Sequence, residues 1–325
     1  MSSEQLQTTF ENYLRSNAFL QQPSELYNAI NYILQLGGKR IRPLLALLSA
    51  ELFHCSYSNA LPVAMAVEIF HNFSLVHDDI MDQAPTRRMK PTVHKLFGTN
   101  TAILTGDVML VYAYNYLIKV ANKNNYHKII DTFNKVAIGV CEGQQMDINF
   151  EKSTDVSIDD YITMIRLKTA VLLEGALQLG AIVAEADEQA IQAIGAFGCN
   201  IGIAFQLQDD LLDAYTTSAT FGKKIGGDIA QNKKTFLYLK ALELANTQEK
   251  RMLIGLYNDK LIAEDKKIEQ VKSLFTKLNI PALTEKLVQE YTQKAFNYLH
   301  SLANVNLEAK NELIKISNML MFRNQ

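Results

Sequence analysis

Two short acidic motifs of the form Asp-Asp-x-x-Asp occur in this chain, at 78–82 and at 209–213. Residues four apart lie on one face of a helix, so we expect Asp78 above Asp82 and Asp209 above Asp213. Carboxylates this close repel one another unless a cation lies among them. Oxygen ligands favour a hard cation, and Mg²⁺ is the usual choice because it binds a few carboxylates together with substrate phosphates.

A single acidic cluster on a helix is more often a solvated surface than a site. Two observations argue against that interpretation here. The runs before the motifs, 69–76 and 201–207, are too apolar for a surface helix, and the same spacing recurs on two separate helices. Because buried carboxylates are costly, a repeated pair of them indicates a function.

Cationic segments accompany the acidic ones. Residues 37–43 read Gly-Gly-Lys-Arg-Ile-Arg-Pro, where the glycines are expected to end one helix and Pro43 to lie in the first turn of the next. Arg87 and Arg88 follow the first motif on a loop, and 222–228 is rich in glycine and lysine. Each cation alone is equally compatible with a solvated position, and Lys168 with a snorkelling one. Together with the carboxylates, they indicate an anion clamp suited to phosphate.

Apolar residues recur at helical spacing through almost the whole chain, and strand-type alternation is scarce. We therefore predict an all-α fold, with a single large helical domain over residues 1–325. The helix 101–121 is strongly apolar and aromatic, which suits either a central core helix or a subunit interface. The expected helices are 4–20, 23–36, 43–55, 60–77, 101–121, 127–146, one opened by Ser157, 187–215, and further amphipathic helices from 236 onward.

Composition restricts the partners. Lys+Arg 32 against Asp+Glu 34 gives a net charge of −2, which argues against nucleic-acid binding. Three scattered cysteines support neither a disulfide framework nor a zinc site. The polar segment 1–17 lacks the pattern of a signal peptide, and no uninterrupted apolar run reaches the ~18–20 residues of a membrane span. We expect a cytoplasmic protein without stable membrane insertion.

With these segments placed, the chain resembles the trans-isoprenyl diphosphate synthases, or polyprenyl synthetases. The resemblance rests on five segments in the family's order. They are Gly-Gly-Lys-Arg-Ile-Arg-Pro at 37–43, Asp-Asp-x-x-Asp with Arg-Arg at 78–88, Lys-Thr at 168–169, Phe-Gln-x-Gln-Asp-Asp-x-x-Asp at 205–213, and Gly-Lys…Asp at 222–228. It implies a single large bundle of mostly antiparallel helices around a central cavity, and a homodimer. It also implies an enzyme that condenses isopentenyl diphosphate with allylic diphosphates.

The resemblance also implies roles for individual residues. Mg²⁺, three ions per site, would be bound by Asp78, Asp82 and Asp209. The allylic diphosphate would be held by Arg87, Lys168 and Lys223, with Lys224 as the alternative to Lys223. Isopentenyl diphosphate would be bound by Lys39, Arg42, His71 and Arg88. Thr169 and Gln206 would face the reacting carbons, with Lys168 and Arg87 completing the catalytic set. Asp79, Asp210, Asp213 and Asp228 would act through waters or other ligands.

Product length is expected to depend on the turn before Asp78, where the family places the floor of its cavity. Phe73 and Ser74 stand there, one bulky and one small, which predicts a product of C15 to C20 and favours geranylgeranyl diphosphate over farnesyl diphosphate. The alternatives are a terpene cyclase and a non-catalytic subunit on the same fold. The intact second motif and the 37–43 loop argue against both.

Overall fold

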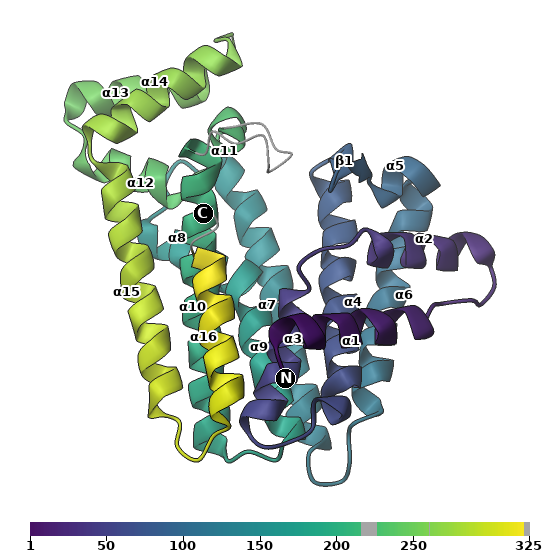
Figure 1. The fold of residues 1–325 in the computed structure, drawn as a ribbon. Helices are drawn as coiled ribbons and strands as arrows, with labels where there is room; N and C mark the ends of the chain where they lie inside the picture. The colour runs from purple at the N-terminus through teal and green to yellow at the C-terminus, as the bar shows by residue number, and fades with distance from the viewer. Residues whose placement is uncertain (216–225, 260, 322–325) are drawn as a thin grey trace. The chain divides into compact units, whose positions relative to one another are not determined.

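The structure is a computed structural model that describes residues 1–215, 226–259 and 261–321 (Figure 1). Within these residues the chain is α-helical apart from one short two-stranded ribbon, which confirms the all-α prediction. The chain forms two compact units. Unit 1 comprises Met1–Ala137, Leu172–Gly198 and Tyr298–Phe322, and unit 2 comprises Ile138–Val171 and Cys199–Asn297. The single domain over 1–325 stays a prediction.

Unit 1 is built around two long helices, α4 and α6, with α4 packed against both α6 and α3. Its elements are α1 (Ser3–Ser16), α2 (Ser24–Gln35), α3 (Ile41–Leu52), α4 (Tyr57–Met81), β1 (Thr86–Arg87), β2 (Lys90–Pro91), α5 (Val93–Phe97), α6 (Thr99–Ile118), the start of α7 (Tyr126–Lys152), most of α9 (Val171–Val183), the start of α10 (Glu188–Tyr215) and α16 (Leu307–Met321).

Unit 2 holds the ends of α7 and α10 and the helices that follow them. Its other elements are α8 (Ile158–Ile165), a π-helical turn η1 (Arg166–Ala170), α11 (Gly227–Ala230), α12 (Phe236–Leu244), α13 (Thr247–Asn258), α14 (Glu264–Lys277) and most of α15 (Ile280–Ser301). A π-turn inside a helix is uncommon and often marks a functional site. This one contains Lys168 and Thr169.

Local sequence signals account for several helix boundaries. Ser157 caps α8 as predicted, since its hydroxyl accepts from the backbone of Asp160 and the Asp160 carboxylate accepts in return. Pro43 lies in the first turn of α3, also as predicted. Several boundaries were wrong. The first helix ends at Ser16 and not at 20, and α4 spans Tyr57–Met81 and not 60–77. The largest difference is at α7, which continues to Lys152, beyond the expected end at 146. The Lys234 ammonium binds the carbonyls of Phe150 and Ser153, so a distant residue satisfies carbonyls at this helix end.

Among the described residues, three helices are long and apolar enough to cross a membrane by length and composition, although polar residues interrupt each of them. The apolar windows of α4 and α10 are 67% and 56% buried inside the protein, so they serve as core helices. The window of α6 is only 39% buried. Its inner face packs on α4, and its outer face leaves apolar side chains exposed. The absence of membrane insertion and the cytoplasmic location stay predictions.

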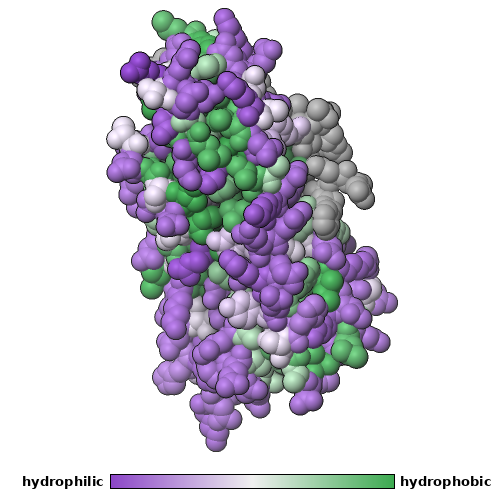
Figure 2. Space-filling model, turned by 90° about the vertical axis from the view of Figure 1, so that its left-hand side faces the viewer, coloured by the Kyte–Doolittle hydropathy of each residue, from purple (hydrophilic) through white to green (hydrophobic). Residues whose placement is uncertain are grey.

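On the face drawn in Figure 2, most of the surface is hydrophilic, and hydrophobic residues reach it in a few gathered areas. Among the exposed apolar side chains of unit 2 are Leu244, Met252, Ile254 and Leu261. Exposed apolar residues of this kind are ordinary on protein surfaces. They do not by themselves indicate a binding site.

Close packing of α9 on α3 makes a first prediction. A Cβ at Gly180 would lie 2.2 Å from the Ala46 carbonyl oxygen, whereas a Cβ at Gly255 would meet nothing within 4 Å. We expect Gly180→Ala to lower the free energy of unfolding by about 1–3 kcal/mol through overpacking. Gly255→Ala on α13 should raise it by about 0.5–1 kcal/mol through helix propensity. Urea unfolding of both variants checks this, and equal effects of the same sign would contradict it.

Candidate functional site

The loop that joins α2 to α3 is held in an unusual backbone conformation. Gly37, Gly38 and Arg40 have φ angles of 81°, 131° and 50°, all in the region that favours glycine. A Cβ at Gly38 would lie 2.8 Å from the Arg88 guanidinium, so the side chain of Arg88 lies against this glycine. The glycine pair is therefore required both for the chain reversal and for the close approach of a cation.

Arg40 holds this loop to α4 through a buried ion pair. Its guanidinium contacts the carboxylate of Glu68 and the carbonyl of Leu34, and Glu68 also accepts from the amide of Asn72 at 3.0 Å. Arg40 and Glu68 are 7% and 2% exposed. Because removal of one partner would leave a buried charge uncompensated, the pair fixes the loop in place.

Arg87 is held by the middle aspartate of the first motif. Its Nε and Nη2 donate to the two carboxylate oxygens of Asp79, both at 2.8 Å, and Asp79 is 2% exposed. Arg87 lies on β1, which pairs with β2, where the sequence analysis expected a loop. The turn between these strands has positive φ at Arg88 and Met89, 51° and 61°, as a tight hairpin turn requires. Such strain in non-glycine residues is typical of functional sites.

His71 lies beside Arg42, with 3.4 Å between His71 Nε2 and Arg42 Nη1. Burial and the neighbouring arginines, Arg42 and Arg88 foremost, hold the pKa of His71 well below its usual value. The imidazole is therefore neutral at pH 7 and accepts the hydrogen bond from Arg42.

The predicted cations of unit 1 thus gather near the start of α3 and the end of α4. The arginines outnumber the two buried carboxylates that they face, Glu68 and Asp79, and the cluster keeps an excess of positive charge. Guanidinium groups held in this way suit a diphosphate, which accepts several hydrogen bonds at once.

The first motif divides its aspartates between two environments. Asp79 points inward to Arg87. Asp78 is half-buried, and Asp82 ends α4 and is exposed. The helix therefore presents Asp78 and Asp82 on the face that Asp79 does not share, as their spacing predicts.

Aromatic residues line α4 below this motif. Phe73 is 8% exposed, and its ring centroid lies 5.0 Å from that of His77 and 5.4 Å from that of Phe70. Behind Phe70 lies Phe133 at 5.3 Å. Ser74 donates its hydroxyl hydrogen to the carbonyl of His71 at 2.8 Å. Phe73 is thus the first ring of a packed aromatic column.

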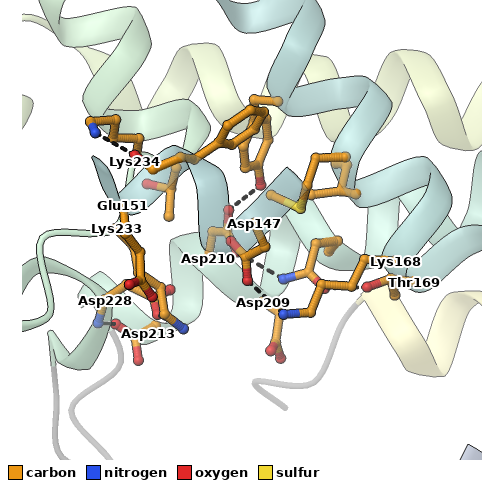
Figure 3. A pocket seen from close by; sticks show the side chains of 16 residues that line it. Asp147, Glu151, Lys168, Thr169, Asp209, Asp210, Asp213, Asp228, Lys233 and Lys234 are labelled. Atoms are coloured by element: carbon orange, nitrogen blue, oxygen red, sulfur yellow. Dashed lines mark hydrogen bonds and ion pairs between the residues drawn. The ribbon is translucent and has the colours of Figure 1, made fainter. Parts of the chain in front are cut away.

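Unit 2 contains a pocket lined by both acidic and basic side chains (Figure 3). Its walls come from the end of α7, from α8 and η1, from the end of α10, and from α11 with the segment after it. It contains these predicted site residues: Lys168, Thr169, Gln206, Asp209, Asp210, Asp213 and Asp228. Lys223 and Lys224 lie outside the described residues.

A chain of hydrogen bonds crosses this pocket. The Tyr161 hydroxyl donates to Asp210 Oδ2, Gln206 Nε2 donates to Asp210 Oδ1 at 2.9 Å, and Thr169 Oγ1 donates to Gln206 Oε1 at 3.0 Å. Burial and the carboxylate of Asp210 raise the pKa of Tyr161 well above its usual value, so the phenol keeps its proton. Burial and Asp228 also raise the pKa of Asp210.

Two lysines are paired across the same pocket. Lys168 Nζ lies 2.6 Å from Asp147 Oδ2, and Lys233 Nζ lies 3.0 Å from Asp228 Oδ1. Burial opposes the charge of Lys233, but Asp228 and other carboxylates raise its pKa, so it stays a cation. The backbone N–H of Asp228 donates to Asp213 Oδ2 at 2.9 Å, which links the second motif to α11.

The donor set bears on the expected metal. Among the described residues, no group of three or more His, Cys, Asp or Glu side chains is placed to hold an ion by itself. The carboxylates of Asp78, Asp82 and Asp209 nevertheless supply the oxygen ligands that Mg²⁺ prefers. Mg²⁺ commonly completes its coordination with water and substrate phosphate, so the carboxylates of each motif fit the ion in the presence of a diphosphate.

Sequence reasoning missed several residues of these arrangements. It assigned no role to Tyr161, Glu68, Lys233 or Asp147. Tyr161 lies 49 residues before its partner Asp210. Glu68 lies on the same helix as the first motif but carries no spacing signal. Lys233 had one, because Asn232-Lys233-Lys234 closely follows the cationic glycine-rich segment.

Known proteins resemble the whole chain. A sequence profile of the family described as polyprenyl synthetase matches residues 23–277. A geranylgeranyl diphosphate synthase of Saccharolobus solfataricus is 34% identical over 306 residues, 93% of this chain and 90% of its own. The crystal structure of a geranylgeranyl pyrophosphate synthase, 44% identical, superposes with a TM-score of 0.94 over 99% of this chain and 98% of that one. A Corynebacterium glutamicum geranylgeranyl pyrophosphate synthase, complexed with isoprenyl diphosphate and magnesium, is 26% identical with a TM-score of 0.84, over 99% and 97%.

The depressed pKa of His71 predicts a pH dependence of stability. Below about pH 6.5, the His71 imidazole binds a proton in the unfolded chain but stays neutral in the folded protein. The free energy of unfolding therefore keeps its full value above that pH and decreases as the pH falls toward the pKa of folded His71. The decrease is at most about 1.4 kcal/mol per pH unit. We expect His71→Asn to show a shallower loss of unfolding free energy between pH 6.5 and 5 than the wild type. His127→Asn, at an exposed site on α7, is the control, and equal slopes for all three proteins would disprove the assignment.

Proposed function

Because this chain belongs to the polyprenyl synthetase family, we propose that it condenses isopentenyl diphosphate with allylic diphosphates to give geranylgeranyl diphosphate, a C20 all-trans product. It is a short-chain trans-prenyltransferase. The observation that carries the proposal is the pair of Asp-Asp-x-x-Asp motifs, each with its middle aspartate turned inward and its flanking aspartates less buried, each accompanied by cations.

Ionisation of an allylic diphosphate separates a delocalised carbocation from the diphosphate anion. The residues that lower its barrier must therefore stabilise the anion as its charge develops. We propose that Arg87 and Lys168 do this for the allylic substrate, with Lys223 as a further ligand. Asp79 holds Arg87 by two hydrogen bonds, and Asp147 holds Lys168. Both cations are thus placed before the substrate arrives, which reduces the reorganisation needed during reaction.

Mg²⁺ is the proposed cofactor, at three ions per site, held by Asp78, Asp82 and Asp209. When bound, Mg²⁺ supplies Lewis-acid stabilisation of the negative charge on the leaving diphosphate. The exposure of Asp82 and the half-buried positions of Asp78 and Asp209 support their role as ligands. Asp79 and Asp210 are already engaged by protein donors and are proposed to act indirectly.

Isopentenyl diphosphate is proposed to bind at the cationic cluster of unit 1, through Lys39, Arg42, His71 and Arg88. The neutral His71 suits this role as a hydrogen-bonding neighbour of Arg42. After its double bond attacks the allylic cation, a proton leaves the new chain, and the released diphosphate is a suitable base. Thr169 and Gln206 face the reacting carbons, where acceptor oxygens favour a cation.

The intact second motif disfavours a terpene cyclase or a silent subunit. A cyclase has no need of a second diphosphate site, yet the loop at Gly37–Pro43 is present and is held by the buried pair of Arg40 and Glu68. A non-catalytic subunit would be expected to lose aspartates, and this chain keeps both triplets.

We also propose that the protein is a homodimer through the outer face of α6. Leu104, Val111 and Ile118 are 56%, 60% and 54% exposed and are spaced by seven residues, which places them on one side of the helix. Exposed apolar residues repeated every seven residues along one helix are typical of a helix–helix interface. We expect a dimer in sedimentation measurements at micromolar concentration, and Val111→Asp should shift it toward monomer. A wild-type monomer would refute this interface.

The catalytic proposal predicts the effect of removing one metal ligand. Purified protein with Mg²⁺, isopentenyl diphosphate and dimethylallyl, geranyl or farnesyl diphosphate should yield a prenyl diphosphate detectable by mass spectrometry. Asp82→Ala should lower kcat by at least about 100-fold, because it removes one proposed ligand of Mg²⁺. Each tenfold decrease corresponds to about 1.4 kcal/mol of lost transition-state stabilisation. Asp131→Ala, an exposed aspartate on α7, is the matched control. Full activity of Asp82→Ala, or activity that resists a chelator, would rule out the proposed role.

The aromatic column predicts control of product length. Phe73→Ala should open space below the motif and lengthen the product by at least one five-carbon unit, because Phe73 is the first ring that the growing chain meets. Phe10→Ala removes another buried ring of unit 1, from α1, and should destabilise the protein without altering the product. Product lengths are read by mass spectrometry. An unchanged product from Phe73→Ala would exclude Phe73 as the floor.

A further inference from the structure

Tyr161 on α8 is a buried tyrosine whose hydroxyl points at the second acidic motif. It is 2% exposed and donates to Asp210, which lies 49 residues later in the chain and is 6% exposed. Neither the motifs nor the proposed binding roles account for it. Because a buried phenol needs a partner for its hydroxyl, the pairing with Asp210 explains its stability. It does not explain why a tyrosine is used there.

Asp210 has a donor on each of its oxygens. Oδ2 accepts from Tyr161, and Oδ1 accepts from Gln206 Nε2 at 2.9 Å. This arrangement determines the orientation of the Gln206 amide, since only its NH₂ end can donate to Asp210. Gln206 Oε1 must then face the other way, toward Thr169.

The orientation of Gln206 in turn determines the hydroxyl of Thr169. An amide oxygen only accepts, so the Thr169 hydroxyl must donate its hydrogen to Gln206 Oε1, at 3.0 Å. The lone pairs of Oγ1 then remain for the pocket. A flipped amide would present N–H groups to Thr169 and would turn the hydroxyl hydrogen toward the pocket.

The backbone beneath Thr169 is equally constrained. Thr169 lies in the π-turn η1, and the residues on either side of Thr169 are packed closely against glycines. A Cβ at Gly143 would lie 2.3 Å from the Lys168 backbone nitrogen, and a Cβ at Gly202 would lie 2.5 Å from Ala170 Cα. The turn therefore has little freedom to move, and the direction of the Thr169 hydroxyl depends on Gln206.

We propose that Tyr161 is a positioning residue, which acts through Asp210 and Gln206 on the hydroxyl of Thr169. It keeps the lone pairs of Thr169 Oγ1, and not the hydroxyl hydrogen, directed at the reacting carbons. This inference rests on the proposed function. Ionisation makes those carbons positive, so preorganised acceptor oxygens stabilise the transition state and a donor hydrogen destabilises it. Without the Tyr161 hydroxyl, Asp210 Oδ2 lacks its donor, and the carboxylate is no longer held in the position that selects one orientation of Gln206.

The test is a double-mutant cycle in steady-state kinetics with Tyr161→Phe and Gln206→Ala. In the wild-type background, Tyr161→Phe should lower kcat by about tenfold and should change the KM of either diphosphate by less than about twofold. In the Gln206→Ala background, the same substitution should change kcat by less than about twofold, because the residue through which Tyr161 acts is gone. Tyr238→Phe, a buried tyrosine on α12 of the same unit, is the matched control and should leave kcat unchanged.

Two kinetic outcomes would overturn the inference. An equal loss of kcat in both backgrounds would mean that Tyr161 supports the fold alone, and a loss confined to KM would mean that it acts on diphosphate binding. A readout without substrate separates this inference from the proposed function. In metal-free protein, the fall in the urea midpoint caused by Tyr161→Phe should be smaller when residue 206 is already alanine.

If the wild type forms no prenyl diphosphate and this coupling is present, the proposed function fails while the hydrogen-bonded chain stands. If the wild type is active and both cycles are additive, the inference fails alone.

Discussion

Crowding of like charges is the constraint on which the surroundings of both acidic motifs depend. Each motif places three carboxylates within five residues, and a folded helix cannot leave all of them unpartnered. Both motifs reduce the repulsion among their carboxylates in the same way. The middle aspartate turns inward to protein donors, Asp79 to Arg87 and Asp210 to Tyr161 and Gln206. The flanking aspartates of each motif then share one face, where the proposed cation and diphosphate would relieve their repulsion.

The inward aspartates also organise the residues that pair with them. Asp79 fixes the guanidinium of Arg87 at two points, and Asp210 fixes the amide of Gln206. Each motif therefore has one buried aspartate that binds protein donors and two less buried aspartates on another face. Loss of the middle aspartate would release a cation in one unit and an amide in the other. The motifs look alike in sequence, but what they position differs.

Buried pairing allows cations to gather closely in unit 1. Arginines near one another repel, and each loses hydration on burial. Two buried carboxylates offset these costs by forming ion pairs. Glu68 pairs with Arg40, and Asp79 pairs with Arg87. The remaining positive charge then stands at the surface, where Arg88 lies against Gly38. The proposed diphosphate would add further negative charge at this cluster.

Much of this architecture followed from the sequence, because it depends on local rules. Helical periodicity predicted the all-α fold, Ser157 and Pro43 predicted two helix starts, and the i, i+4 spacing predicted which aspartates share a face. These signals lie within a few residues of the features they govern. The family's five segments also identified the chemistry, since each matches in residue type and order.

Only the tertiary structure decided which partners those residues meet. The local sequence of α8 does not predict that Tyr161 contacts Asp210. The local sequence around Arg40, in the loop before α3, does not predict that Arg40 contacts Glu68. The partners in these two contacts are 49 and 28 residues apart in the chain. The same holds for the extension of α7 to Lys152, where Lys234 satisfies carbonyls from a distance. Spacing along a chain determines the face on which a side chain lies. What covers that face, and hence which hydrogen bonds and pKa shifts arise there, is determined by packing between elements.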